Sequence, residues 1–201
     1  MRKFMLGLHG FNVNDNGLAT IDKLRPFAEW AGYTWVDGDY GWKGLVGVNI
    51  ANEPIAGIIS QCCNHFLGPE DYVVLAGHSN GCAISALVDH TWTPNIKQLL
   101  LINPALDRDW VFSERLDGVH IFGTPGDVWT GLSRWLPGME WGAMSNGYEG
   151  DQEFVLYHDM SKDKDHPINS HSAVFEDEND DYWLRKMINC VQACEGMNSG
   201  D

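Results

Sequence analysis

The stretch V-V-L-A-G-H-S-N-G-C-A-I-S at residues 73–85 decides the fold of this chain. An apolar run ends at Gly77, a single serine follows at Ser79, and a second glycine, Gly81, precedes small residues that predict a helix. Such a strand–turn–helix presents the serine hydroxyl at the end of a buried strand, where side chains at the two glycines would collide with neighbouring backbone. The next amide, that of Asn80, points from the helix N-terminus into the same space and can donate to an oxyanion.

Short apolar runs alternate with helical patterns on both sides of this stretch. The expected strands are residues 3–8, 33–36, 72–76, 97–102, 118–122 and 154–157. The expected helices, in which apolar residues recur at helical spacing, are residues 20–31, 52–66, 81–90 and 181–194. Strands that alternate with helices form a parallel sheet that is covered on both faces. The sequence therefore predicts a three-layer α/β fold with about six mostly parallel strands.

Length and charge bound the classes of function. The chain has 201 residues without an internal repeat or a linker-like segment, which predicts one domain over residues 1–201. Its net charge of −15 argues against binding to a nucleic-acid backbone and against docking on an anionic membrane. No apolar run approaches the roughly 18 residues of a membrane span, and the first residues lack the apolar core of a secretory signal. We therefore expect a cytoplasmic protein without stable membrane insertion.

Cysteines and acidic residues give no expectation of a metal site. The 5 cysteines are an odd number in a chain that is long enough to need no disulfides, so reduced thiols are expected. Cys190 and Cys194 lie one helical turn apart but lack a second pair at zinc-finger spacing. The acidic loop 159–166 lacks the glycine and the terminal glutamate of an EF-hand, so it is expected to be a solvated loop.

Polar residues follow the strands at the points where function is expected. In a parallel sheet, ligands bind beyond the carboxyl ends of the strands. The motif H-G-F-N follows the first strand at residues 9–12, G-T-P-G-D-V-W follows the fifth at 123–129, and N-S-H-S ends the loop after the sixth at 169–172. Ser79, Asp127 and His171 therefore stand in this chain order at three strand ends.

These motifs resemble those of the α/β-hydrolase family. G-H-S-N-G in a strand–turn–helix context resembles that family's nucleophile elbow, H-G-F resembles its oxyanion loop, and the order serine, aspartate, histidine is also the family's order. The resemblance runs from Phe4 to Cys194 and implies a minimal three-layer α/β-hydrolase fold, similar to small lipases and esterases. It implies no large cap domain, and the segment 128–150 is the candidate for a partial lid.

The resemblance assigns a role to each motif residue. Ser79 is the expected nucleophile, His171 the general base, and Asp127 the acid that orients the imidazole. The backbone N–H groups of Phe11 and Asn80 are expected to form the oxyanion hole.

Other residues compete for three of these roles. His158 and His166 are alternatives for the base, because both follow the last strand. Asp107 or Asp109 is the alternative acid, and Asn12 is the alternative source of the second oxyanion amide.

Three aromatic residues stand close behind strand ends. Tyr40, Trp42 and Trp129 are expected to line an apolar substrate pocket, with core packing as the equally weighted alternative.

The resemblance predicts a serine hydrolase that cleaves a carboxylic ester by acyl transfer, with a small-molecule ester or acyl substrate and no cofactor. A thioesterase, an amidase or a peptidase would use the same triad, because the motif does not specify the leaving group. A non-catalytic binding or scaffold protein on this fold is the alternative from another class.

Overall fold

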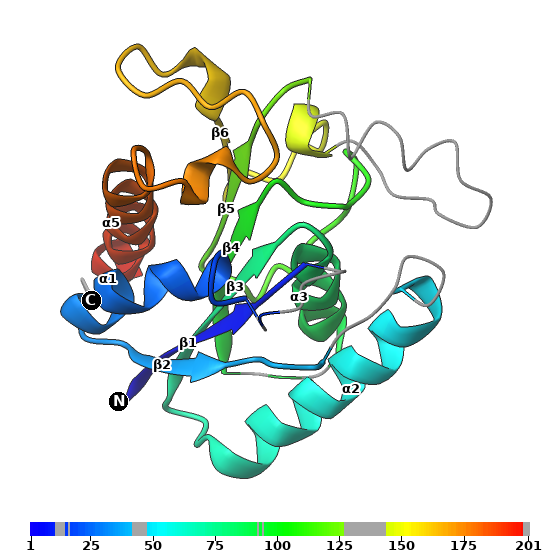
Figure 1. The fold of residues 1–201 in the computed structure, drawn as a ribbon. Helices are drawn as coiled ribbons and strands as arrows, with labels where there is room; N and C mark the ends of the chain where they lie inside the picture. Colours follow the sequence, from blue (N-terminus) through cyan, green and yellow to red (C-terminus); the bar gives the residue numbers. More distant parts are fainter. Residues whose placement is uncertain are drawn as a thin grey trace.

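A six-stranded parallel sheet forms the centre of the protein. The computed structural model describes residues 1–10, 15, 17–41, 48–91, 93, 95–126 and 144–198. The strands are β1 (Lys3–Leu8), β2 (Thr34–Asp37), β3 (Tyr72–His78), β4 (Ile96–Ile102), β5 (Gly118–Gly123) and β6 (Val155–Asp159). All neighbouring strands pair in parallel, in the order β2-β1-β3-β4-β5-β6 (Figure 1). The predicted three-layer α/β architecture with six parallel strands is confirmed.

Helices cover both faces of the sheet. The described α-helices are α1 (Arg25–Trp30), α2 (Val48–Phe66), α3 (Asn80–His90) and α5 (Asp180–Asn198). Short 3-10 segments lie at η1 (Ile21–Leu24), η3 (Met144–Asn146), η4 (Met160–Lys162) and η5 (Ala173–Phe175). Figure 1 shows α2 and α3 on one face and α1 and α5 on the other. Within the described ranges, no large cap domain covers the sheet, and no helix combines the length and apolar character needed to cross a membrane.

Alternate side chains of each central strand enter two separate cores. Val74 and Ala76 of β3 pack into the core beneath α1 and α5, whereas Val73 and Leu75 pack into the core beneath α2 and α3. All seven residues of β3 are buried. A strand buried on both faces needs apolar residues at every position, which explains the unbroken apolar run that precedes the serine.

The prediction of a single helix over residues 20–31 is wrong in its N-terminal part. The chain forms a 3-10 segment, η1, and then the short helix α1, which begins at Arg25. Pro26 explains the break, since it has no backbone N–H to bond to the preceding turn and is tolerated only in the first turn of a helix. The N-terminal half of the predicted helix therefore cannot continue through Pro26 as α-helix.

The direction in which the chain adds strands reverses between β1 and β3. From β1 the chain passes outward to β2 and then returns to β3 on the other side of β1. Such a reversal leaves the loops after the two neighbouring strands free to diverge, and ligands bind in the opening between them. Leu8 at the end of β1 lies opposite Gly77 at the end of β3. The H-G-F-N and G-H-S-N-G motifs therefore begin side by side.

Two glycines allow α3 to pass close to the sheet after the serine turn. A Cβ atom on Gly81 would lie 2.1 Å from the carbonyl oxygen of Leu8, and one on Gly77 would lie 2.7 Å from the backbone nitrogen of Cys82. Both contacts are with backbone, which cannot move aside as a flexible side chain can. The two glycines of the motif are therefore required by packing.

Gly81→Ala is expected to lower the free energy of unfolding by about 3 kcal/mol or more, because the new methyl group collides with the backbone of β1. Gly57→Ala is the matched control, since Gly57 lies inside α2 with no atom within 4 Å of the added methyl group. This control is expected to raise the free energy of unfolding by up to about 1 kcal/mol through helix propensity. Urea denaturation of both variants measures the difference, and equal stability of the two would contradict it.

Two residues of the segment 128–150 belong to the core. Met144 and Ser145 in η3 are fully buried, and the carbonyl oxygen of Ser145 accepts a hydrogen bond of 2.7 Å from the Tyr157 hydroxyl in β6. Met144 and Ser145 are therefore packed against the sheet, and the lid role of the segment stays a prediction. Residues 127–143, which hold the rest of the predicted lid, lie outside the described residues.

Candidate active site

Ser79 occupies a strained turn between β3 and α3. Its φ of 55° and ψ of −118° are rare for a residue with a side chain, and such a conformation costs about 1–3 kcal/mol. Its N–H donates to the carbonyl oxygen of Ile102 at 3.0 Å, and its own carbonyl oxygen accepts from the N–H groups of Cys82 at 3.1 Å and Ala105 at 3.2 Å. The backbone of β4 and of the loop after it therefore holds the serine turn in its strained conformation.

The loop after β1 lies directly against Ser79. A Cβ atom on Gly10 would lie 3.2 Å from the Cβ of Ser79 and 3.7 Å from its Oγ. The backbone of Gly10 is therefore a close neighbour of the serine hydroxyl, as an oxyanion loop needs to be. Phe11 and Asn12, the candidates for the second oxyanion amide, follow Gly10 and lie outside the described residues, so this role stays a prediction.

Tyr40 fixes the same loop. Its hydroxyl donates to the carbonyl oxygen of His9, and its ring stacks on the His9 imidazole with ring centroids 4.1 Å apart. The His9 Nδ1 lies 2.7 Å from the carbonyl oxygen of Gly10. Burial raises the pKa of Tyr40, so its hydroxyl remains a hydrogen-bond donor at physiological pH. The sequence did not predict this contact, which holds the loop after β1 in place.

An apolar groove extends from Tyr40 along the sheet edge. It lies between α2 and the strands β1 and β2 and has a volume of about 850 Å³. Its apolar lining includes Phe4, Leu6, Val36, Ile55 and Ile58. Tyr40 therefore lines an apolar groove, whereas Trp42 and Trp129, the other predicted pocket residues, lie outside the described residues.

A reciprocal pair of side-chain amides anchors the start of α3. Asn52 Nδ2 donates to Asn80 Oδ1 at 2.9 Å, and Asn80 Nδ2 donates to Asn52 Oδ1 at 3.0 Å. Both residues are buried, where an unpaired amide would cost free energy. The pair fixes the first residue of α3, whose backbone amide is the expected oxyanion donor. The role of Asn52 is invisible in the sequence, because it depends on the contact between α2 and α3.

His171 lies beside the serine turn. Its carbonyl oxygen accepts from Asn103 Nδ2 at 2.7 Å and contacts His78 Nε2 at 3.3 Å. The imidazole rings of His171 and His78 have centroids 4.9 Å apart, and His78 directly precedes Ser79. Burial lowers the pKa of His78 to about 3, so its ring stays neutral beside His171. The structure therefore brings His171, the predicted base, next to the turn that carries Ser79, the predicted nucleophile.

The two alternative histidines make their ring contacts elsewhere. The His158 ring stacks on Phe122 of β5 with centroids 4.3 Å apart, and the His166 ring stacks on Tyr182 of α5 at the same separation. These contacts are on β5 and α5, whereas His171 contacts the residue that precedes Ser79. Of the three candidates, the geometry favours His171 as the base.

Asn103 links three parts of the site. It follows β4 with a φ of 45°, in the left-handed region that asparagine tolerates better than most residues. Besides its bond to His171, its Oδ1 accepts from the N–H of Thr124 at 2.8 Å, and its own N–H donates to the carbonyl oxygen of Phe122 at 2.8 Å. The sequence analysis missed Asn103. A polar residue directly after an apolar strand was the available signal.

The acid of the triad stays a prediction. Asp127 directly follows Gly126, the last described residue of its loop, and lies outside the described residues. Gly126 has a φ of 88°, and its N–H donates to Asn146 Oδ1 at 2.7 Å. The alternatives Asp107 and Asp109 are both exposed. The acid that orients the histidine of a triad is usually buried, so the exposure of Asp107 and Asp109 argues against both as the acid.

Comparison with known proteins supports the fold. The chain matches no protein-family model, and no curated protein matches it in sequence. A protein from Xanthomonas campestris assigned to the alpha/beta hydrolase superfamily is 18% identical with a TM-score of 0.56, over 96% of this chain and 99% of that one. Alpha/beta hydrolase domain-containing protein 10 from mouse is 11% identical with a TM-score of 0.59, and the match covers 94% of this chain and 89% of the mouse protein. A predicted CIB-like hydrolase from Thermoplasma acidophilum is 14% identical with a TM-score of 0.54, and the match covers 96% of this chain and 86% of that protein.

These likenesses, together with the strand order and the serine turn, establish the class of fold. The chain has the α/β-hydrolase fold in a small form, as the motif resemblance predicts.

Proposed function

We propose that this protein is a serine hydrolase that cleaves carboxylic esters by acyl transfer. The observation that carries the proposal is the strained turn at Ser79, with His171 held beside it through Asn103 and His78. Backbone strain of this kind persists where the surrounding structure enforces it, and it concentrates at functional sites. A serine hydroxyl is a weak nucleophile without an adjacent base, and in this proposal His171 is that base.

In the proposed mechanism, His171 accepts the hydroxyl proton of Ser79 while Ser79 Oγ attacks the ester carbonyl. The backbone N–H groups of Asn80 and Phe11 stabilise the negative charge that develops on the carbonyl oxygen. His171 then donates the proton to the departing alcohol, and water releases the acid by the reverse sequence. Asp127 orients the imidazole and stabilises its protonated form.

The groove that Tyr40 lines supports an apolar acyl group, since Tyr40 also holds the loop after β1. The groove beside Tyr40 is lined mainly by aliphatic and aromatic side chains, and such a surface stabilises a hydrocarbon chain by about 25 cal/mol per Å² of apolar area removed from water. The net charge of −15 disfavours strongly anionic substrates. A neutral small-molecule ester is therefore the proposed substrate class.

A series of leaving groups on one acyl chain tests the reaction type. Ethyl butyrate, S-ethyl thiobutyrate and N-ethylbutyramide differ only at the atom that departs, and the butyrate released from each is quantified by chromatography. The proposal expects kcat/KM to be largest for the ethyl ester. A larger value for the thioester or the amide would assign the site to a different hydrolase class.

Asn103→Asp is expected to lower kcat by about tenfold to a hundredfold with KM changed by less than about twofold. The change keeps the acceptor oxygen for Thr124 but places a carboxylate oxygen against the carbonyl oxygen of His171, which displaces the base. Turnover is measured per active serine, counted by titration with a fluorophosphonate, so that partial unfolding does not mimic the effect. An unchanged kcat per active serine would show that Asn103 does not position the base.

A further inference from the structure

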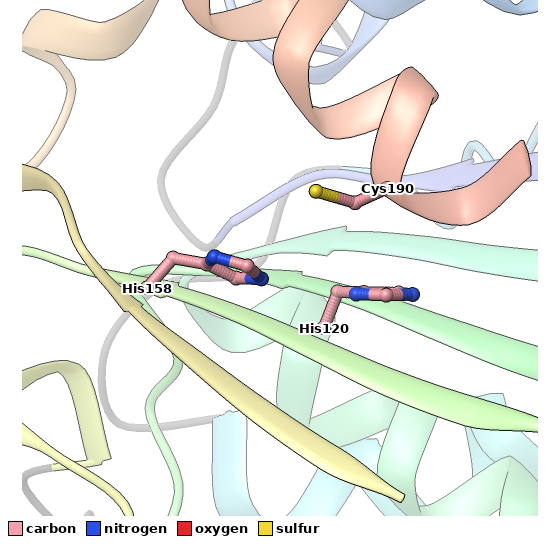
Figure 2. A group of neighbouring side chains, drawn as sticks. All are labelled: His120, His158 and Cys190. Carbon is pink, nitrogen blue, oxygen red and sulfur yellow. The ribbon is translucent and has the colours of Figure 1, made fainter. Parts of the chain in front are cut away.

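Three potential metal ligands converge between the sheet and α5. They are His120 of β5, His158 of β6 and Cys190 of α5, and one ligand atom from each lies within 4.8 Å of the others. Figure 2 shows Cys190 on the helix above the two imidazole rings, which lie along the sheet. The mechanism proposed for Ser79 uses none of them.

The sheet register explains why these side chains meet. His158 pairs with Phe122 in the neighbouring strand, and His120 precedes Phe122 by two residues and so faces the same side of the sheet. The α5 helix packs on this side and supplies Cys190 from above. None of the three is close to another in the sequence, so no ligand spacing signals the cluster.

The imidazole nitrogens that face the cluster lack hydrogen bonds. His120 is 1% exposed, and neither its Nδ1 nor the Nε2 of His158 has a hydrogen-bond partner among the described residues. A buried polar atom without a partner costs about 1–3 kcal/mol, so a protein rarely keeps two of them side by side without a use. The other nitrogen of His120, Nε2, lies 3.4 Å from Cys194 Sγ, which leaves Nδ1 as the nitrogen that can bind a metal ion.

We propose that His120, His158 and Cys190 bind one Zn²⁺ ion, with water as the fourth ligand. Two imidazoles and one thiolate form a donor set that suits this borderline-soft cation. Zinc–nitrogen bonds of about 2.0–2.1 Å and a zinc–sulfur bond of about 2.3 Å place tetrahedral ligand atoms about 3.4–3.6 Å apart. The ligand atoms lie within 4.8 Å of one another, so they would have to approach by at most about 1.4 Å to reach that spacing.

The protonation states suit the binding step. Burial lowers the pKa of His120 to about 4 and also lowers the pKa of His158, so both imidazoles are neutral and available at physiological pH. Burial raises the pKa of the Cys190 thiol, so zinc binding releases its proton to solvent as the zinc–sulfur bond forms. The ion would join β5, β6 and α5 and stabilise the C-terminal part of the fold.

Titration of the metal-free full chain with Co²⁺ tests the site, because Co²⁺ takes the same ligands as Zn²⁺ and is coloured. We expect a thiolate-to-cobalt charge-transfer band in the near ultraviolet that saturates at one equivalent and disappears when Zn²⁺ is added. Cys190→Ser removes this band, and His158→Gln weakens binding at least about tenfold. Cys62→Ser is the matched control, since Cys62 is an exposed thiol on α2 and leaves the spectrum unchanged.

Zinc is also expected to raise the melting temperature of the wild type by about 5 °C or more at a hundredfold excess over its Kd. Absence of the charge-transfer band at one equivalent would overturn the proposal, as would a band that persists in Cys190→Ser or vanishes in Cys62→Ser. Far-ultraviolet circular dichroism of each variant with a chelator present verifies folding. If His120→Gln fails to fold, the half-buried positions Cys190 and His158 decide the outcome.

Discussion

Ser79→Ala is expected to abolish ester hydrolysis and to leave the fold intact. Loss of the nucleophile from a triad lowers kcat by about a millionfold, because the remaining members cannot act on the substrate without it. Stability should change by less than about 1 kcal/mol, since alanine has the same Cβ atom and carries the same backbone strain as serine at a φ of 55°. Ester turnover and thermal unfolding of the same preparation measure both effects.

Ser85→Ala is the matched control for this variant. Ser85 is fully buried in α3, where its hydroxyl donates to the carbonyl oxygen of Gly81 at 2.9 Å. Its loss removes a helix-internal hydrogen bond close to the turn, and we expect ester turnover within about threefold of wild type. Hydrolysis that persists in Ser79→Ala, or that is lost equally in Ser85→Ala, would contradict the assignment of Ser79 as nucleophile.

His171→Ala is expected to lower kcat almost as far as Ser79→Ala, by about 10⁵-fold or more, because serine and base act as one unit. The rise of kcat with pH that reports deprotonation of the base should also disappear. The variant should remain folded, since the backbone carbonyl oxygen that accepts from Asn103 and contacts His78 is also present in alanine. The rate and the pH profile measured together distinguish loss of a base from displacement of the loop.

His166→Ala serves as the control for the base. Its ring stacks on Tyr182 of α5, and its backbone carbonyl oxygen accepts from Trp183 Nε1 at 2.9 Å. We therefore expect kcat close to wild type in this variant. If kcat falls by about 10⁴-fold or more in His166→Ala while His171→Ala remains active, the base is His166 and not His171.

The sequence was sufficient to predict the architecture around Ser79. The apolar run and the two glycines predicted a buried strand, a tight turn and a helix, and the structure has β3, Ser79 and α3 there. The strand was predicted to end at residue 76 but continues to His78. His78 pairs with Ile102 of β4, and pairing with a neighbouring strand is information that a local pattern does not contain.

The contacts that assemble the site could not be predicted in the same way. Asn103 joins the His171 loop to Thr124 only because β4 lies beside β5, which leads to Thr124, and the loop after β6 returns to the end of β4. His120 and His158 lie near each other on one face of the sheet because of the register between β5 and β6. Strand order and register depend on packing across the whole sheet, whereas motif spacing reports only neighbours along the chain.

The most direct test of the central claim is covalent labelling with a fluorophosphonate, followed by mass spectrometry of the digested protein. Such a probe reacts with a serine that an adjacent base activates and not with an ordinary surface hydroxyl. We predict one adduct per chain, located on Ser79, in the wild type and none in Ser79→Ala. An unlabelled wild type, or an adduct on another serine, would contradict the proposal that the Ser79 turn is the catalytic centre of a serine hydrolase.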